Sequence, residues 1–171
     1  SLTLMDIVPT YVLLNDLKRE VAKAYYHWFF LSQPSPFPEK LIATDPDYFF
    51  QNNLTAWGAS SLSEYRTDQL QAYRTAWRDP QCIRAMCDDY RATSDFDFSM
   101  DEVDLPRRIS VPALVVWGSV GAMARSYDMR TIWEERLCTY QTATIKGGHF
   151  FPDTAPKDTV EALLKFLAAI D

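Results

Sequence analysis

A short, continuous apolar run, Ala113-Leu-Val-Val-Trp117, constrains the fold more than any other part of the 171-residue chain. Apolar side chains at five successive positions suit a strand covered on both faces, which is typical of parallel sheets flanked by helices. Gly118 marks a loop at its carboxyl end. A weaker strand is expected at about 140–146, with helices at about 127–137 and 156–170. This alternation predicts an α/β layer. In the last helix, the residues expected to form the apolar face are Val160, Leu163, Leu164, Phe166 and Leu167.

The first residues, Leu2 to Val8, resemble the end of a buried strand, with Asp6 where the strand should end and Pro9 closing it. A buried strand needs neighbours on both sides, so we expect further strands from outside this sequence. No strand pattern occurs between residues 10 and 110. The helices predicted there span about 12–32, 37–43, 45–56, 67–77 and 79–91. Asp45-Pro46 and Asp79-Pro80 each place an N-cap acid before a proline at the first helical position.

Charge and cysteine content exclude several classes of function. The formal net charge is −6 and no Lys/Arg run offsets it, which argues against a nucleic-acid surface. The cysteines Cys82, Cys87 and Cys138 form no CxxC pair, so we expect reduced thiols in a cytoplasmic protein. No apolar run approaches the 18 residues of a membrane span, and the first residues do not form a signal peptide. With two distant histidines and no glycine-rich phosphate loop, we expect neither a metal nor a cofactor.

His149 is the first candidate for chemistry, because it follows Gly147 and Gly148 at the predicted carboxyl end of the last strand. Open α/β sheets place their sites at that edge, although a histidine there can also be an ordinary loop residue. Asp6, at another strand end, can orient a histidine or cap the helix that follows. His27 lies among aromatic residues and is interpreted, from the pattern alone, as a core histidine. With Trp28 it also offers two N–H donors suited to an anion.

Several longer motifs resemble the haloacetate (fluoroacetate) dehalogenase family, in the same order and with the same gaps over nearly the whole chain. The motifs are Met5-Asp-Ile-Val-Pro-Thr-Tyr11, Tyr26-His-Trp-Phe-Phe30, Trp77-Arg-Asp-Pro80, Met86-Cys-Asp-Asp-Tyr-Arg-Ala92 and Gly147-Gly-His-Phe-Phe-Pro152. The resemblance implies the C-terminal part of an α/β-hydrolase sheet with an inserted all-helical cap domain. It divides the chain into the end of a core strand with the triad acid (1–10), the cap (11–107) and the last strands and helices of the core (108–171).

The same resemblance assigns roles to individual residues. Asp6 corresponds to the acid of the triad and His149 to the base. The cap donors that bind the leaving halide correspond to His27, Trp28 and Tyr90. Trp57, in Leu54-Thr-Ala-Trp-Gly58, corresponds to a further aromatic residue of the pocket. Many capped relatives place an aspartate in the loop after the strand 113–117, but this loop has none, which favours Asp6 as the acid.

The nucleophilic aspartate, the oxyanion-hole donors and the arginines that bind the substrate carboxylate are absent from this chain, as is any GxSxG motif. The implied activity is hydrolytic dehalogenation of a 2-haloacid through an aspartyl ester, with the nucleophile supplied by an N-terminal half on the same or a separate chain. The isolated chain is expected to be inactive. Expected partners are that half, the 2-haloacid and the released halide, and a second copy in a homodimer. The alternatives are an epoxide hydrolase or other capped hydrolase, and an inactive truncated hydrolase or binding module.

Overall fold

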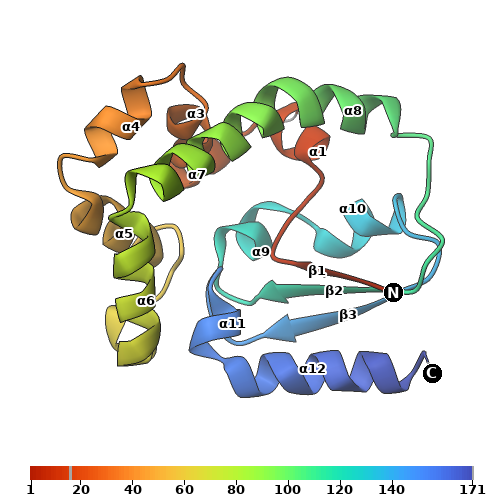
Figure 1. Cartoon of the computed structure of the whole chain (residues 1–171). Coiled ribbons are helices and arrows are strands. Elements are labelled where there is room, and N and C mark those ends of the chain that lie inside the picture. Colours follow the sequence, from red (N-terminus) through yellow and green to blue (C-terminus); the bar gives the residue numbers. More distant parts are fainter. Residues whose placement is uncertain (16, 171) are drawn as a thin grey trace.

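A parallel sheet forms the base of the protein in the computed structural model, which describes residues 1–15 and 17–170 (Figure 1). Within these residues the strand order is β1 (Leu2–Met5), β2 (Ala113–Gly118) and β3 (Tyr140–Ile145), all parallel. The central strand, β2, is buried except at Trp117, as its continuous apolar run predicts.

The first strand ends at Met5, directly before Asp6, where the sequence predicted its end. It differs from the expectation of a buried strand because all four of its residues are only half-buried. In the described chain β1 pairs with β2 alone, in the register Leu2 to Ala113, so its other edge has no strand neighbour. A strand with one neighbour is covered on one side only, which accounts for its exposure.

Successive residues of β2 point to opposite faces of the sheet, as strand geometry requires. Ala113 and Val115 join the core on the side of α9 (Ala122–Ser126) and α10 (Met129–Glu134). Leu114 and Val116 pack on the other face, with Phe166 of the last helix. Figure 1 shows this helix, α12, on one side of the three strands and α9 and α10 on the other. The sheet is therefore the middle layer of three.

The elements that the described residues form between β1 and β2 are all helices, and we call α1 to α8 the helical segment. Figure 1 shows it passing above α9 and α10 and then down beside the end of the sheet to which the strand arrows point. Its elements are α1 (Thr10–Asn15), α2 (Arg19–Ala24), α3 (Tyr26–Leu31), α4 (Phe37–Ile42), α5 (Pro46–Thr55), the 3₁₀ turn η1 (Leu62–Glu64), α6 (Thr67–Trp77), α7 (Pro80–Ala92), the π-helical turn η2 (Thr93–Asp97) and α8 (Phe98–Val103).

The sequence predicted most of these helices, but it predicted a single helix over 12–32 where the structure has three short ones. Tyr25 separates α2 from α3 with φ −105° and ψ 35°, and its side chain is buried in the main core at 2% exposure. The part of the prediction that falls on Asp16 lies outside the described residues. The N-caps are as predicted, since the Asp45 carboxylate accepts from Tyr48 N–H and the Asp79 carboxylate from Gln81 N–H.

The sequence did not predict η2 and α8 in the helical segment. In the C-terminal region, the loop expected after β2 contains α9. Helix α12 (Pro156–Ala168) follows the short α11 (Phe151–Thr154), and its predicted apolar face is only partly covered. Phe166 is buried, whereas Val160, Leu164 and Leu167 are 51%, 61% and 43% exposed. The apolar stripe of α12 is thus wider than the three described strands can cover. Among the described helices, none is both long and apolar enough to cross a bilayer.

Candidate active site

The carboxyl ends of the three strands meet at one edge of the sheet and bring Asp6, Gly118 and His149 together. Asp6 follows β1, Gly118 ends β2, and His149 follows β3. One carboxylate oxygen of Asp6, Oδ1, accepts the Gly118 N–H at 3.0 Å, and Oδ2 lies 2.8 Å from His149 Nδ1. Parallel strands present their carboxyl ends on the same side, which is where sheets of this class place binding sites.

The backbone at Asp6 has a left-handed conformation, with φ 48°. Only glycine, and to a lesser extent aspartate and asparagine, adopt this region readily. The turn directs the carboxylate back across the strand ends, and its Cα is held because the Asp6 N–H donates to Val116 O at 2.7 Å. The side chain is 1% exposed, so its two acceptor contacts replace water.

The loop before His149 comes so close to the helical segment that it leaves no room for side chains. Gly147 has φ 147°, which favours glycine. A Cβ on Gly148 would lie 2.0 Å from the Gly58 carbonyl oxygen. That carbonyl accepts the His149 N–H at 3.0 Å. When Nδ1 carries the proton toward Asp6, Nε2 is the basic nitrogen, and this is the tautomer that a general base requires.

The Trp57 ring connects His149 with His27, the other histidine of the chain. The Trp57 ring lies 5.0 Å from the His149 ring and stacks on His27 at 4.2 Å with an interplanar angle of 12°. The Tyr90 ring meets His27 edge-on at 5.6 Å. His27 is 2% exposed, and its Nδ1 is buried without a hydrogen-bond partner among the described residues, as is Trp57 Nε1.

Burial determines the protonation of these groups. It lowers the pKa of His27 to about 3, with a smaller contribution from the charge of His149, so His27 is neutral near pH 7. Burial also raises the pKa of Tyr90 to about 12, and the charge of Asp89 adds to this, so the phenol keeps its proton. Both side chains therefore offer hydrogen-bond donors without a positive charge.

A cavity of about 330 Å³ lies between the helical segment and the loop of His149. Its walls are mostly apolar and aromatic, and the described residues that line it include no carboxylate, serine or cysteine. They are His27, Leu31, Phe50, Asn53, Leu54, Trp57, Tyr73, Ala76, Trp77, Met86, Tyr90, His149 and Phe150. The cavity thus contains two histidines and several donors, but its described lining offers no carboxylate, serine or cysteine as the nucleophile.

The structure groups most of the residues that the sequence singled out. Asp6 and His149 form a pair, and His27, Trp57 and Tyr90 share the cavity wall. Trp28 differs, since its ring contacts that of Tyr90 at 5.6 Å but does not line the cavity. Sequence reasoning missed Asn53 and Tyr73, which lie in ordinary helical patterns and give no local signal. It assigned no role to Phe150, although Phe150 belongs to the motif that contains His149. Among the described residues no cluster of metal-binding side chains occurs.

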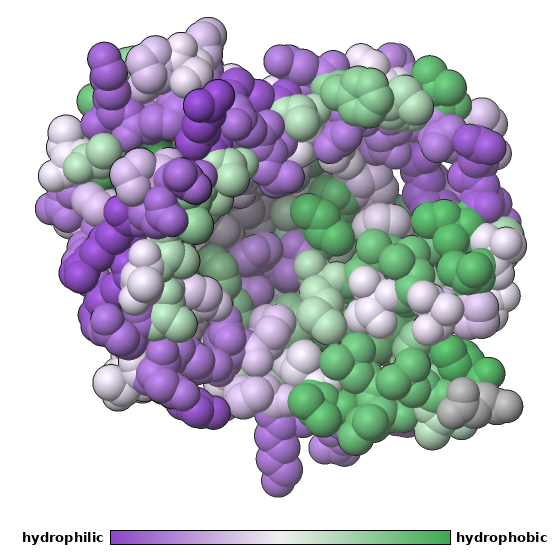
Figure 2. Space-filling view, viewed as in Figure 1, coloured by the Kyte–Doolittle hydropathy of each residue, from purple (hydrophilic) through white to green (hydrophobic). Residues whose placement is uncertain are grey.

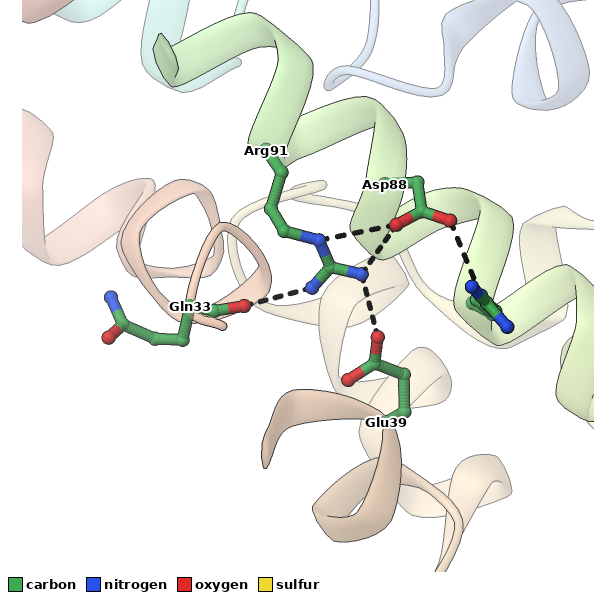
Figure 3. Close-up of polar contacts among 5 residues, drawn as sticks. Gln33, Glu39, Asp88 and Arg91 are labelled. Carbon is green, nitrogen blue, oxygen red and sulfur yellow. Dashed lines mark hydrogen bonds and ion pairs between the residues drawn. The ribbon is translucent and has the colours of Figure 1, made fainter. Parts of the chain in front are cut away.

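A network of ion pairs supports the wall that carries Tyr90 (Figure 3). Arg91, the next residue on α7, donates to Glu39 of α4 at 2.7 Å, to Asp88 at 2.8 Å and to the Gln33 carbonyl at 2.8 Å. The side chains of Arg91 and Glu39 are only 17% and 14% exposed. A multiply bonded, half-buried guanidinium of this kind fixes the position of a helix better than a single surface ion pair.

The parallel sheet between two layers of helices defines the α/β-hydrolase fold, and the comparisons with known proteins agree. A solved α/β hydrolase from Nostoc sp PCC 7120 superposes with a TM-score of 0.91 at 39% identity, over 96% of this chain and 56% of that one. A structure from Pseudomonas aeruginosa, described as an epoxide hydrolase, gives a TM-score of 0.87 at 33% identity, over 98% and 56%. The fold is that of the C-terminal part of an α/β-hydrolase sheet.

The particular resemblance is to the fluoroacetate dehalogenases. The chain is 46% identical to a fluoroacetate dehalogenase from Burkholderia sp over 168 residues, which are 98% of this chain and 55% of that protein. This confirms the family resemblance seen in the motifs. The chain spans little more than half the length of the relatives it matches. No family model matches it.

Proposed function

We propose that this chain forms part of a hydrolase that removes halide from a 2-haloacid such as haloacetate. The observation that carries the proposal is the Asp6–His149 pair, which faces an aromatic cavity with uncharged donors. A general base next to a pocket with N–H and O–H donors suits a reaction in which an anion leaves and a water attacks. The 46% identity to a fluoroacetate dehalogenase supports the substrate class.

The proposed chemistry has two steps. In the first, a carboxylate from outside this chain attacks the α-carbon of the 2-haloacid, forms an ester and displaces the halide. His27 and Tyr90, on the cavity wall of the helical cap, donate hydrogen bonds to the departing halide, where negative charge develops. Trp28 is the third donor that the family resemblance implies, and its ring contacts that of Tyr90 from outside the cavity wall. Trp57 forms part of the same pocket. Because His27 is neutral, its donor stabilises the halide without holding it as a fixed ion pair would.

In the second step, a water attacks the carbonyl of the ester, and His149 Nε2 accepts the proton. The bond between the carboxyl carbon of the nucleophile and the ester oxygen then breaks, and the protonated His149 returns the proton to that oxygen. The 2-hydroxyacid leaves with the ester oxygen, and the carboxyl group of the nucleophile is regenerated. Asp6 holds the imidazole in the required tautomer and stabilises the imidazolium that forms. Its burial at 1% exposure keeps water from competing for this contact.

The partner that we propose is the remaining part of the hydrolase sheet, on the same polypeptide or on a second one. The free edge of β1 borders a groove of about 700 Å³ that includes Leu4, Ile7 and Trp133. Figure 2 shows apolar residues gathered over the side where β1 and α12 lie. A free strand edge beside exposed apolar side chains favours pairing with further strands and helices. The relatives contain a further stretch of nearly half their length.

Halide release tests the proposal directly. The protein, in the form in which it purifies and with any co-purifying chain retained, is incubated with fluoroacetate and chloroacetate, and the free halide is measured with an ion-selective electrode. We expect catalytic release by the assembled protein. A His149→Asn variant should release at most one halide per site and retain the ester, visible as a mass increase of the chain with the nucleophile. No halide release from an assembled sheet would refute the proposal.

An epoxide hydrolase is the second candidate. It is favoured by the similarity to the Pseudomonas aeruginosa structure and by Tyr90, whose protonated phenol in the cavity could donate to an epoxide oxygen. Incubation of the same preparation with a styrene-oxide-type substrate, followed by measurement of the diol, separates the two activities. If the preparation forms neither halide nor diol, the remaining alternatives are a binding module and an inactive hydrolase.

A further inference from the structure

Asp153, one turn after His149, connects the loop of the histidine to the helical segment. Its carboxylate accepts hydrogen bonds from the Tyr73 hydroxyl and, at 3.1 Å, from the Gln69 side-chain amide. Both donors lie on α6, 80 and 84 residues earlier in the chain. The described residues place no cation within ion-pair distance of Asp153. The carboxylate is thus held by two neutral donors from one helix.

The same two parts of the chain touch again beside His149. The Gly58 carbonyl, after α5, accepts the His149 N–H at 3.0 Å. A Cβ on Gly58 would lie 2.6 Å from the Phe150 ring, so backbone and ring are in close contact. The Phe150 ring also packs against the rings of Trp57 and Tyr65. The backbone of His149 is therefore held by the helical segment, while its imidazole is held by the sheet through Asp6.

These contacts are arranged so that a movement of α6 would change the position of His149 and the shape of the cavity together. Tyr73 and Phe150 both line the cavity. Asp153 joins Tyr73 to the short helix α11, which directly continues the loop of His149. If Tyr73 separated from Asp153, the cavity wall formed by α6 would be free to move away. The hydrogen bond from the His149 N–H to the Gly58 carbonyl, which restrains the His149 backbone, would then be weakened. Hydrogen bonds to a charged acceptor are stronger than those between neutral groups, which suits such a role.

We propose that Asp153, Tyr73 and Gln69 form a latch that holds the helical segment against the loop of His149, and that Asp153 is a positioning residue for the histidine. Asp153 acts through the backbone from His149 to α11. The latch rests on the proposed function only in the naming of His149 as the general base. Its existence and its effect on the histidine loop are testable without any substrate.

Hydrogen exchange, followed by mass spectrometry, tests the latch on the protein as it purifies. The variant Tyr73→Phe removes only the hydroxyl, and Asp153→Ala removes the acceptor of both bonds. We expect exchange of residues 56–61 and 147–154 to rise roughly tenfold in either variant, the factor for one hydrogen bond to a charged group. Hydrogen exchange in the double variant should be no faster than in Asp153→Ala alone, because both changes break the same contact.

The matched control is Tyr26→Phe. It also removes one tyrosine hydroxyl from the helical segment, but that hydroxyl donates to Asn53 within the segment, at 3.2 Å. Exchange at 147–154 should stay at the level of the unaltered protein. The proposal is overturned if Tyr73→Phe leaves both segments unchanged, or if exchange rises equally throughout the chain, including β2, since that indicates a general loss of stability. Halide release is not used, so a failure of the proposed activity remains a separate result.

Discussion

Replacement of Gly148 by alanine is expected to destabilise the protein strongly, because the loop of His149 and the turn after α5 meet there backbone to backbone. The new Cβ would lie 2.0 Å from the Gly58 oxygen and 2.8 Å from the Ala59 oxygen. Ordinary contacts of a Cβ begin at 3.4 Å. Neither neighbour is the flexible end of a side chain, so the two loops have to separate.

The magnitude follows from the interactions that this separation strains or breaks. Overpacking of this kind costs about 1–3 kcal/mol. Moving Gly58 away also breaks the hydrogen bond from His149 N–H to its carbonyl, worth about 1 kcal/mol. A combined loss of about 3 kcal/mol corresponds to a fall in Tm of roughly 6–12 °C for a chain of this size.

Gly121→Ala is the matched control for Gly148→Ala, because Gly121 also lies at the carboxyl edge of the sheet. Its Cβ would meet Asp6 Oδ2 at 3.6 Å and the Gly118 oxygen at 3.7 Å, and its φ of −70° suits alanine. We expect a change within about 0.5 kcal/mol. Thermal and urea unfolding, followed by circular dichroism, give both values. Equal midpoints for the two variants would refute the close approach at Gly148.

Three further predictions concern His27, Arg91 and Asp6. The folded pKa of His27, about 3, lies below its ordinary 6.5, so its contribution to stability is complete above pH 6.5 and is lost as the pH falls toward 3. Urea unfolding should show about 2 kcal/mol less stability at pH 5 than at pH 6.5 from this group, and His27→Gln should remove that part of the slope. Arg91→Ala should cost about 1–3 kcal/mol in the same assay, because it leaves a half-buried carboxylate unpaired, whereas the exposed Arg107→Ala should cost less than about 0.5. In the assembled enzyme Asp6→Asn should slow halide turnover by roughly 10⁴-fold through the wrong tautomer of His149, and a loss below tenfold would contradict its role.

The strands and the pairing at their ends were predictable from the sequence. The apolar run before Gly118 identifies a central strand, and both Asp6 and His149 follow strand patterns. Parallel strands end on the same side, so two residues at strand ends are expected to be neighbours even when far apart in the sequence. Their separation of 2.8 Å between Oδ2 and Nδ1 agrees with that expectation, and their catalytic roles remain predictions.

The helical segment was predictable in its class but not in its detail. Helical periodicity does not show that Tyr25 turns inward and divides the first predicted helix, since that depends on the core the ring enters. Nor does it show that Trp57 lies between two histidines, or that Trp28 lies outside the cavity wall. The positions of side chains in a pocket built from four or more segments depend on tertiary packing, which a local pattern does not contain.

The bond between Asp6 and His149 joins residues 143 positions apart and closes a loop of nearly the whole chain. Closing so long a loop costs conformational entropy before any contact within it can form. The helical segment, in contrast, forms mostly through contacts between residues near in sequence. We therefore expect the helical segment to form early in folding and the contact between Asp6 and His149 to form among the last. A refolding chain would then have its helices in place before these two side chains meet.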